Sequence, residues 1–242
     1  MIERIKIIKE KLEELKNLDK GFSVFGASRH KHQFNTRLSA QEIEQIETDN
    51  GITLNNEYKE VLKHLGNGGA GCGYGLEALS LKNIDPPYIG SAKLLRNWGN
   101  PEDIEQEMVD IDEISGYIKL FDYGCGMETC LIVKGEETGS LIYFDCDERF
   151  EKIKNRTILD IYDYWLDANI TELKRVQQKL NEMSLQEVID EEWALDNFSI
   201  KEIILSLINA EPLTGNHSGT DIQNHLEKEY QKWSNRSLNG ID

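Results

Sequence analysis

The stretch most suggestive of chemistry is a glycine-rich segment, LGNGGAGCGYGLEAL, at residues 65–79. It contains Gly66-x-Gly68-x-x-Gly71, the spacing with which a loop cradles the phosphates of a dinucleotide. That fingerprint requires a strand before the loop and, after it, a helix whose amino end receives the pyrophosphate. Here a helical pattern precedes the glycines and a strand-like pattern follows them, and no Gly-Lys-Ser/Thr sequence completes a mononucleotide loop. The order of elements therefore argues against a nucleotide cofactor.

Two further patterns suggest metal binding. His30-Lys-His32 would place two imidazoles on one side of an extended segment. Asp145-Cys-Asp147-Glu148 offers clustered carboxylates of the kind that Mg²⁺ or Ca²⁺ prefers. The histidines have no third ligand near them in the sequence, and the acids lack the regular spacing and the glycine of a calcium loop. We interpret the first pattern as a basic surface spot and the second as a solvated strand end, and we expect no metal or cofactor.

Nucleophilic catalysis is not indicated either. The chain has no Gly-x-Ser-x-Gly motif, and its four cysteines show no Cys-x-x-Cys spacing. Cys72 and Cys125 lie among glycines, but no base can be assigned to them. We therefore expect thiols in a reducing compartment, mostly buried, and no enzymatic activity.

The charge is strongly acidic and unevenly distributed. The chain carries 27 basic and 44 acidic side chains, a net charge of −17. Residues 101–170 alone hold 6 basic and 18 acidic side chains, or −12, and PEDIEQEMVDIDE at 101–113 has seven acids and no base. Such a field repels nucleic acid and speeds association with basic partners. The composition therefore favours a basic protein partner over direct nucleic-acid binding.

Hydrophobic spacing indicates the elements that must position these residues. Aliphatic residues recur every three or four positions in residues 2–18, which predicts an amphipathic helix. Residues 19–37 show no sustained period and are interpreted as a linker or an irregular entry segment. A Ser-x-x-Glu capping box at Ser39 predicts a helix that ends at Gly51.

The following segments alternate between the two kinds of element. A helix begins near Asn55 and ends at Gly66, which we expect to be left-handed. Residues 75–81 read as a short strand, and Thr157 caps a later helix. From about residue 170 the pattern is entirely helical. Three further strands are predicted at 116–123, 128–135 and 139–145, the last two joined by a Gly135-to-Gly139 hairpin.

The order of these elements resembles the SUKH superfamily in its Smi/Knr form. Members run helix, Gly-x-x-Leu-Pro, Tyr, Leu, Asn-Gly-Gly, then glycine-framed strands and a helix with Trp-Leu. The resemblance covers residues 38–168 and departs from the family pattern at Asn55, where proline is usual and an N-cap asparagine starts the same helix. The matching positions, interpreted as fold determinants, are Gly51, Leu54, Tyr58, Leu62, Asn67, Gly68, Gly69, Gly116, Gly124, Gly126, Gly135, Gly139, Trp165 and Leu166.

The resemblance implies an α+β domain with a mainly antiparallel sheet flanked by helices. Around this SUKH-like domain at 38–168 we expect an N-terminal helix and linker at 1–37 and an all-helical C-terminal appendage at 169–242. Bacterial members are similar to immunity proteins that bind and neutralise a toxin, often a nuclease. Fungal members are similar to a regulator of cell-wall synthesis that acts as a binding scaffold. Neither role requires catalysis.

We therefore expect an intracellular immunity protein whose acidic surface covers a basic toxin, here expected to be a nuclease. A nuclease must be basic to hold phosphates, and carboxylates can occupy the same Lys and Arg sites. The first acidic patch consists of Glu102, Asp103, Glu105, Glu107, Asp110, Asp112 and Glu113, and the second of Asp145, Asp147 and Glu148.

The alternative is a non-catalytic scaffold or regulatory module that holds a cellular partner with the helices of 171–235. Exposure of Trp193 and Trp233 on those helices would favour it. The first residues lack a secretory signal, and no stretch approaches the roughly 18 apolar residues of a membrane span. We expect a cytoplasmic protein with no membrane contact and no small-molecule substrate.

Overall fold

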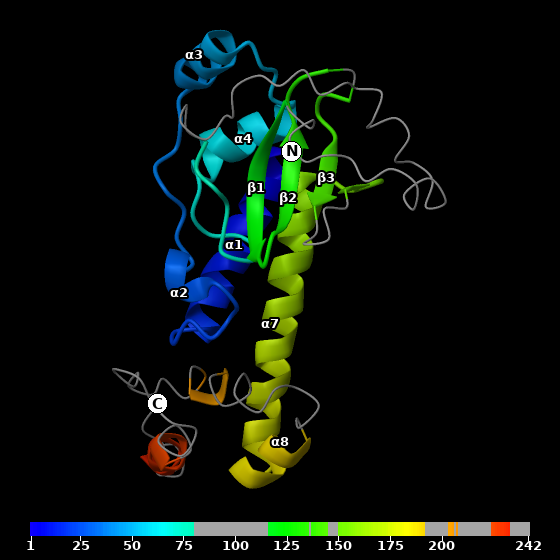
Figure 1. Cartoon of the computed structure of the whole chain (residues 1–242). Helices are drawn as coiled ribbons and strands as arrows, with labels where there is room; N and C mark the ends of the chain where they lie inside the picture. Colours follow the sequence, from blue (N-terminus) through cyan, green and yellow to red (C-terminus); the bar gives the residue numbers. More distant parts are fainter. Residues whose placement is uncertain are drawn as a thin grey trace, which may run out of the picture. The chain divides into compact units, whose positions relative to one another are not determined.

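The computed structural model describes residues 1–79, 116–135, 137–144, 150–191, 203–205, 207 and 224–232. Within them the chain has the α+β fold that the sequence predicts, with helices flanking a four-stranded antiparallel sheet (Figure 1). The labelled helices are α1 (Ile2–Leu18), α2 (Ala27–His30), α3 (Ala40–Asn50), α4 (Asn56–His64), α7 (Ile158–Glu182) and α8 (Leu185–Glu191), and residues 224–232 are also helical. The strands are β1 (Tyr117–Gly124), β2 (Met127–Ile132), β3 (Leu141–Phe144) and β4 (Phe150–Lys152).

These elements belong to two compact units. The first comprises Met1–Lys9 and Arg29–Trp165 and contains the sheet. The second comprises Glu10–Ser28 and Leu166–Asp242, and its described elements are helical. Because α1 and α7 each cross a boundary, both helices contribute residues to both units.

The sheet is a meander in the order β1-β2-β3-β4. The three predicted strands are present, with their ends shifted by a few residues. Cys125 and Gly126 form the turn between β1 and β2, and both have positive φ, 53° and 78°. Positive φ in a two-residue turn matches the twist of the strands that it joins. At the predicted second hairpin, the Gly139 amide donates to the Ile132 carbonyl at 2.8 Å.

Two strand expectations need correction. The short strand predicted at 75–81 is reduced to an isolated bridge, in which Leu76 pairs with both Gly69 and Phe121, and residues 80 and 81 lie outside the described part. The sequence also missed β4, which pairs with β3. A strand of three residues offers too few positions to show alternation.

The core of the first unit lies between the sheet, α4 and the first turns of α7. Tyr58 from α4, Phe121 from β1 and Tyr162 from α7 are fully buried. The rings of Phe121 and Tyr162 meet edge to face, with centroids 5.6 Å apart. The Tyr162 hydroxyl donates to the Ala70 carbonyl at 2.9 Å, so the same side chain contacts both the sheet and the glycine-rich segment.

The helix ends follow local sequence signals with one exception. Ser39 and Glu42 form the predicted capping box, and Gly51 ends α3 in the left-handed conformation with φ 55°. The prediction for Gly66 is wrong, because α4 is capped by Leu65 in right-handed geometry and Gly66 has no positive φ. Gly66 is needed for a non-local reason: a Cβ there would lie 2.4 Å from the Asn35 carbonyl oxygen.

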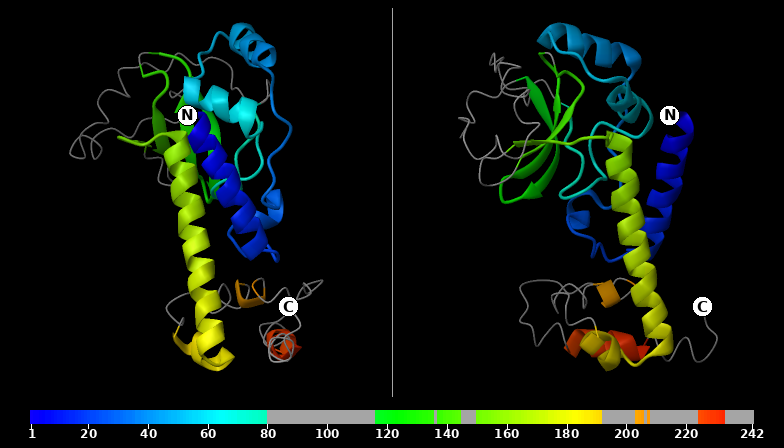
Figure 2. Two further views of the ribbon diagram at one scale, coloured as in Figure 1. Left: turned by 180° about the vertical axis from the view of Figure 1, so that it is seen from behind. Right: turned by 90° about the vertical axis from the view of Figure 1, so that its right-hand side faces the viewer.

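The N-terminal helix packs against α7, and the two run side by side in the same direction (Figure 2). Its buried face consists of Ile5, Ile8, Leu12 and Leu15, as predicted, whereas Ile2 is exposed. Each such buried aliphatic side chain contributes about 1.5–3 kcal/mol. Burial on this scale makes α1 an integral part of both units.

The linker predicted at 19–37 contains more structure than its sequence indicates. It includes α2 and a turn built on the buried Asp19, whose carboxylate accepts from the Ser23 and Val24 amides at 2.6 and 3.1 Å. Further along the chain, α7 is a single helix of 25 residues. The helical pattern near residue 170 is therefore a continuation of the helix that Thr157 caps.

A charged cluster joins α1, α4 and the amino end of α7. The Arg4 guanidinium bonds to the carboxylates of Asp160 and Asp163 at 2.6 and 3.1 Å and lies 3.9 Å from that of Glu57. Glu57 in turn accepts from the Ile158 amide at 2.9 Å. Burial favours a higher pKa for Asp160, but bonds from Thr157 and Arg4 outweigh it and hold the pKa of Asp160 below its usual value. Glu57 thus caps a helix that begins about a hundred residues later in the sequence.

Replacing Arg4 by methionine is expected to lower the free energy of unfolding at pH 7 by about 1 kcal/mol, the scale of a half-exposed ion pair. A depressed pKa means that Asp160 stabilises the fold above its unfolded pKa and ceases to do so as pH falls through the folded one. The difference between wild type and variant should therefore shrink below about pH 4. Urea unfolding at pH 7 and pH 3 measures it.

The matched control is Lys9→Met on the same helix, because Lys9 is exposed and lies outside the Arg4 cluster. It should leave the free energy of unfolding within about 0.5 kcal/mol of wild type at both pH values. An Arg4→Met effect that is the same at pH 7 and pH 3 would contradict the electrostatic explanation.

Candidate partner-binding surface

Both predicted acidic patches lie outside the described residues, but the segments that hold them are anchored to described ones. The first patch lies between Leu79 and Gly116. The side chain of Asn67 makes two bonds to the Leu79 backbone, at 2.7 and 3.1 Å. The Gly116 carbonyl accepts from the Val133 and Lys134 amides at 2.6 and 3.0 Å. The patch residues concerned are Glu102, Asp103, Glu105, Glu107, Asp110, Asp112 and Glu113.

The second patch, Asp145, Asp147 and Glu148, lies between β3 and β4. Phe144, which precedes it, pairs with Glu128 at the start of β2. The first patch instead rejoins the sheet beside Val133, just beyond the end of β2. At about 3.3 Å per residue, the two anchor points are roughly 17 Å apart. The described residues that flank the two patches, Gly116 and Phe144, therefore lie beside opposite ends of β2.

The glycine junction, residues 65–79, uses its backbone amides for bonds within itself and to other parts of the chain. The amides of Gly69, Ala70 and Tyr74 donate to the carbonyls of Leu76, Gln33 and Asp122 at 2.7–2.9 Å. A phosphate would need several of these N–H groups to be available. Because they are committed to carbonyls, the segment serves as a packing junction.

Gly68 and Gly69 have φ of 92° and 101°, a conformation that side chains disfavour. A Cβ on Gly69 would lie 2.3 Å from the Gln33 carbonyl oxygen, and one on Gly68 would lie 3.0 Å from the Ala78 amide nitrogen. Gly69 also pairs with both Phe34 and Leu76, and Leu76 pairs with Phe121. The junction thus links the segment after α2 to the first strand of the sheet.

An exposed aromatic and basic cluster, which the sequence did not indicate, lies on this junction. The Arg29 guanidinium lies 5.9 Å from the centre of the Tyr74 ring and 3.4 Å from the Glu77 carboxylate. A Cβ at Gly124 would lie 3.1 Å from the Tyr74 ring. The tyrosine is 36% exposed. In the sequence it stands between two glycines, Gly73 and Gly75, and this was the one feature that could have indicated an exposed aromatic side chain.

The histidine pair does not form the basic surface spot that the sequence suggested. His30 and His32 are buried, at 8% and 1% exposure, and their ring centroids are 5.5 Å apart. The ring of His30 also meets that of Trp165 edge to face, at 6.0 Å. Lys31 between them is exposed, whereas the His30 ring packs on Trp165 of α7 and the His32 ring packs on His30. Periodicity could not reveal this, since the partner is more than 130 residues away.

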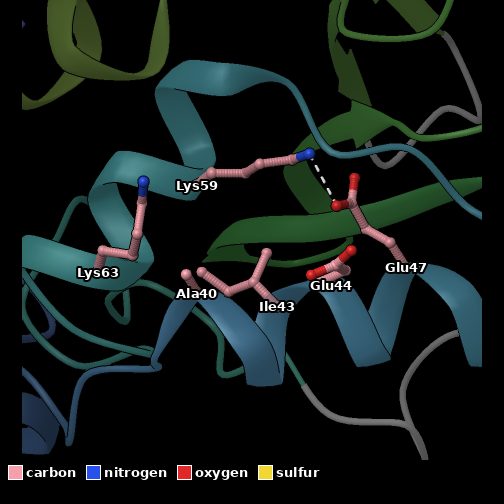
Figure 3. A pocket seen from close by; sticks show the side chains of 6 residues that line it. All are labelled: Ala40, Ile43, Glu44, Glu47, Lys59 and Lys63. Atoms are coloured by element: carbon pink, nitrogen blue, oxygen red, sulfur yellow. Dashed lines mark ion pairs between the residues drawn. The ribbon is translucent and has the colours of Figure 1, made fainter.

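A small cavity lies between α3 and α4 (Figure 3). Its volume is about 250 Å³, and it is lined by Ala40, Ile43, Glu44, Glu47, Lys59 and Lys63. Lys59 reaches across from α4 to the Glu47 carboxylate at 2.7 Å. The other Glu47 oxygen accepts from the Leu54 amide, also at 2.7 Å. The pair holds the two helices together at one end of the cavity.

Two features of the described residues bear on catalysis by a metal or a thiolate. No group of three or more metal-binding side chains occurs among them. Burial raises the pKa of the Cys72 thiol to about 12, and it also raises the pKa of Cys130. Both groups are protonated at neutral pH and are poor nucleophiles. Cys125 is exposed in the β1–β2 turn, and Cys146 lies outside the described part.

The profile of the SMI1/KNR4 family (SUKH-1) matches residues 37–186, well over half of the chain. The chain belongs to the SUKH-1 family. The resemblance in the sequence is thereby confirmed, and the match continues beyond residue 168 to include all of α7. No curated protein and no solved structure matches the chain significantly.

SUKH-1 membership identifies a binding module of the immunity or regulatory kind. The α3–α4 cavity, the glycine junction and the sheet all lie within the matched residues, whereas α1 lies outside them.

None of the described helices is both long and apolar enough to cross a membrane.

The family positions have distinct structural environments. Leu54, Tyr58, Leu62, Trp165 and Leu166 are buried. All the glycines among the family positions have positive φ. They are Gly51, Gly68, Gly69, Gly116, Gly124, Gly126, Gly135 and Gly139. Asn67 is bonded to Leu79 through its side chain.

Proposed function

We propose that this SUKH-1 protein is a cytoplasmic immunity protein that binds and neutralises a basic toxin, a nuclease, without catalysis of its own. The observation that carries the proposal is the charge of residues 101–170, at 6 basic against 18 acidic side chains. A nuclease collects Lys and Arg to hold phosphates, and carboxylates compete for the same positions with charge-assisted bonds. Family membership supports the binding role.

The described residues that flank the two acidic patches, Gly116 and Phe144, are close enough for one partner to span both. Their anchor points are roughly 17 Å apart along β2. A typical interface buries about 800 Å² on each partner, which corresponds to a patch on the order of 30 Å across.

The scaffold alternative rests on exposure of Trp193 and Trp233, both of which lie outside the described residues.

The test is co-expression with the product of the adjacent gene. We expect that product to kill cells when it is expressed alone and to be harmless together with this chain. The purified pair should form a complex whose affinity falls as salt increases, because Lys–carboxylate contacts are screened. If the neighbouring product is toxic and this chain neither binds nor protects, the proposal is wrong.

A further inference from the structure

The cavity between α3 and α4 has the size and lining of a receptor for one side chain. At about 250 Å³ it is smaller than the roughly 300–1,000 Å³ of pockets that bind drug-sized ligands. It is bounded by two helices that the Glu47–Lys59 pair links. Ile43 forms a buried apolar wall, at 3% exposure, and Ala40 continues that wall toward solvent.

The charged side chains that line the cavity differ in whether they are already paired. Lys59 is paired with Glu47, and Lys63 with Glu60, whose pKa is lowered chiefly by the hydrogen bond from Lys63. Glu44 is exposed, and among the described residues its carboxylate has no recorded ion pair or hydrogen bond. Figure 3 shows it on α3 beside Glu47, at the edge of the cavity. The cavity thus offers one available carboxylate next to an apolar wall.

The rest of α3 adds to the negative charge of Glu44. α3 carries four acids, Glu42, Glu44, Glu47 and Asp49, and no basic residue. A cationic group beside Glu44 is therefore attracted by the carboxylates of this helix.

We propose that the α3–α4 cavity receives a lysine or arginine side chain from the basic partner. The aliphatic stem lies on Ala40 and Ile43, and the charged head bonds to Glu44. Long basic side chains match such a lining, because they combine an apolar stem with a cationic tip. This inference rests on the proposed function, and it adds a contact on the described surface that is separate from both acidic patches.

The experiment measures the affinity of the full-length chain for the adjacent gene's product, inactivated in its own active site, by calorimetry at fixed salt. Glu44→Lys should weaken binding about tenfold or more, the scale of a lost close charge pair. Ala40→Leu, which fills the cavity and leaves the charge unchanged, should also weaken binding. The matched control is Asp49→Lys, an equal charge change on an exposed residue of the same helix that does not line the cavity. It should alter affinity by about twofold or less, as expected for a rim charge.

Equal losses for Glu44→Lys and Asp49→Lys, with Ala40→Leu unchanged, would show that only the overall field matters and would overturn the inference. If both Glu44→Lys and Ala40→Leu bound the partner with unchanged affinity, the inference would also be overturned. The immunity role would still stand in that case, because the wild-type chain binds the partner. Failure of the wild-type chain to bind or protect would instead reject the proposed function, and this inference with it.

Discussion

Replacing Gly69 by valine is expected to destabilise the folded chain by about 3–5 kcal/mol, enough to remove much of a typical domain's stability. A Cβ at this position would lie 2.3 Å from the Gln33 carbonyl oxygen and 2.8 Å from the Asn35 amide nitrogen. The backbone has no room to shift, because the amide and carbonyl of Gly69 both bond to Leu76 at 2.8–2.9 Å. The positive φ of 101° adds strain of about 1–3 kcal/mol. Urea unfolding measures the loss.

Gly51→Ala is the matched control for this prediction. Gly51 also has positive φ, 55°, but no atom lies within 4 Å of a Cβ built there. It should therefore show only the left-handed penalty of about 1–2 kcal/mol. If Gly69→Val and Gly51→Ala were equally destabilising, the close approach of Gln33 would not be the reason for glycine in the junction.

Reversing four acids of the first patch should reduce partner affinity by about a hundredfold or more at low salt and abolish protection of the cell. The substitutions are Glu102→Lys, Asp103→Lys, Glu105→Lys and Glu107→Lys. Each turns an attraction to a basic groove into a repulsion, and desolvated charge pairs in protein interfaces are worth about 1.5–7 kcal/mol. Affinity is measured over a range of salt concentrations, and the variant should lose most of the salt dependence.

The control for this reversal changes the same amount of charge elsewhere, at exposed Glu3, Glu10, Glu13 and Glu182 of α1 and α7. It should weaken binding far less, because only long-range attraction is lost. A separate reversal of Asp145, Asp147 and Glu148 tests the second patch. Unchanged protection by the first-patch variant would reject this surface while leaving the family's binding role in place.

Local patterns correctly predicted several features whose deciding interactions are close in the sequence, although the local signal at Gly66 misled. The capping box of α3 joins residues three apart, and the left-handed Gly51 follows from the end of that helix. The buried stripe of α1 needs only a period of three or four residues. Where a pattern was too short, as in β4, or depended on a distant partner, as in the buried histidines, the prediction was wrong or absent.

By itself the sequence determined the α+β class, most of the helices and strands, the family and the strongly acidic charge, because these depend on composition and on neighbours within a few residues. Only the tertiary structure decided why Gly66 and Gly69 must be glycine, that Glu57 caps α7, and that α3 and α4 enclose a cavity beside Glu44. Each of these contacts joins segments that are farther apart in the sequence than a local pattern reaches. The largest separation, between Glu57 and the start of α7, is about a hundred residues. Their geometry arises from packing, which no local spacing encodes.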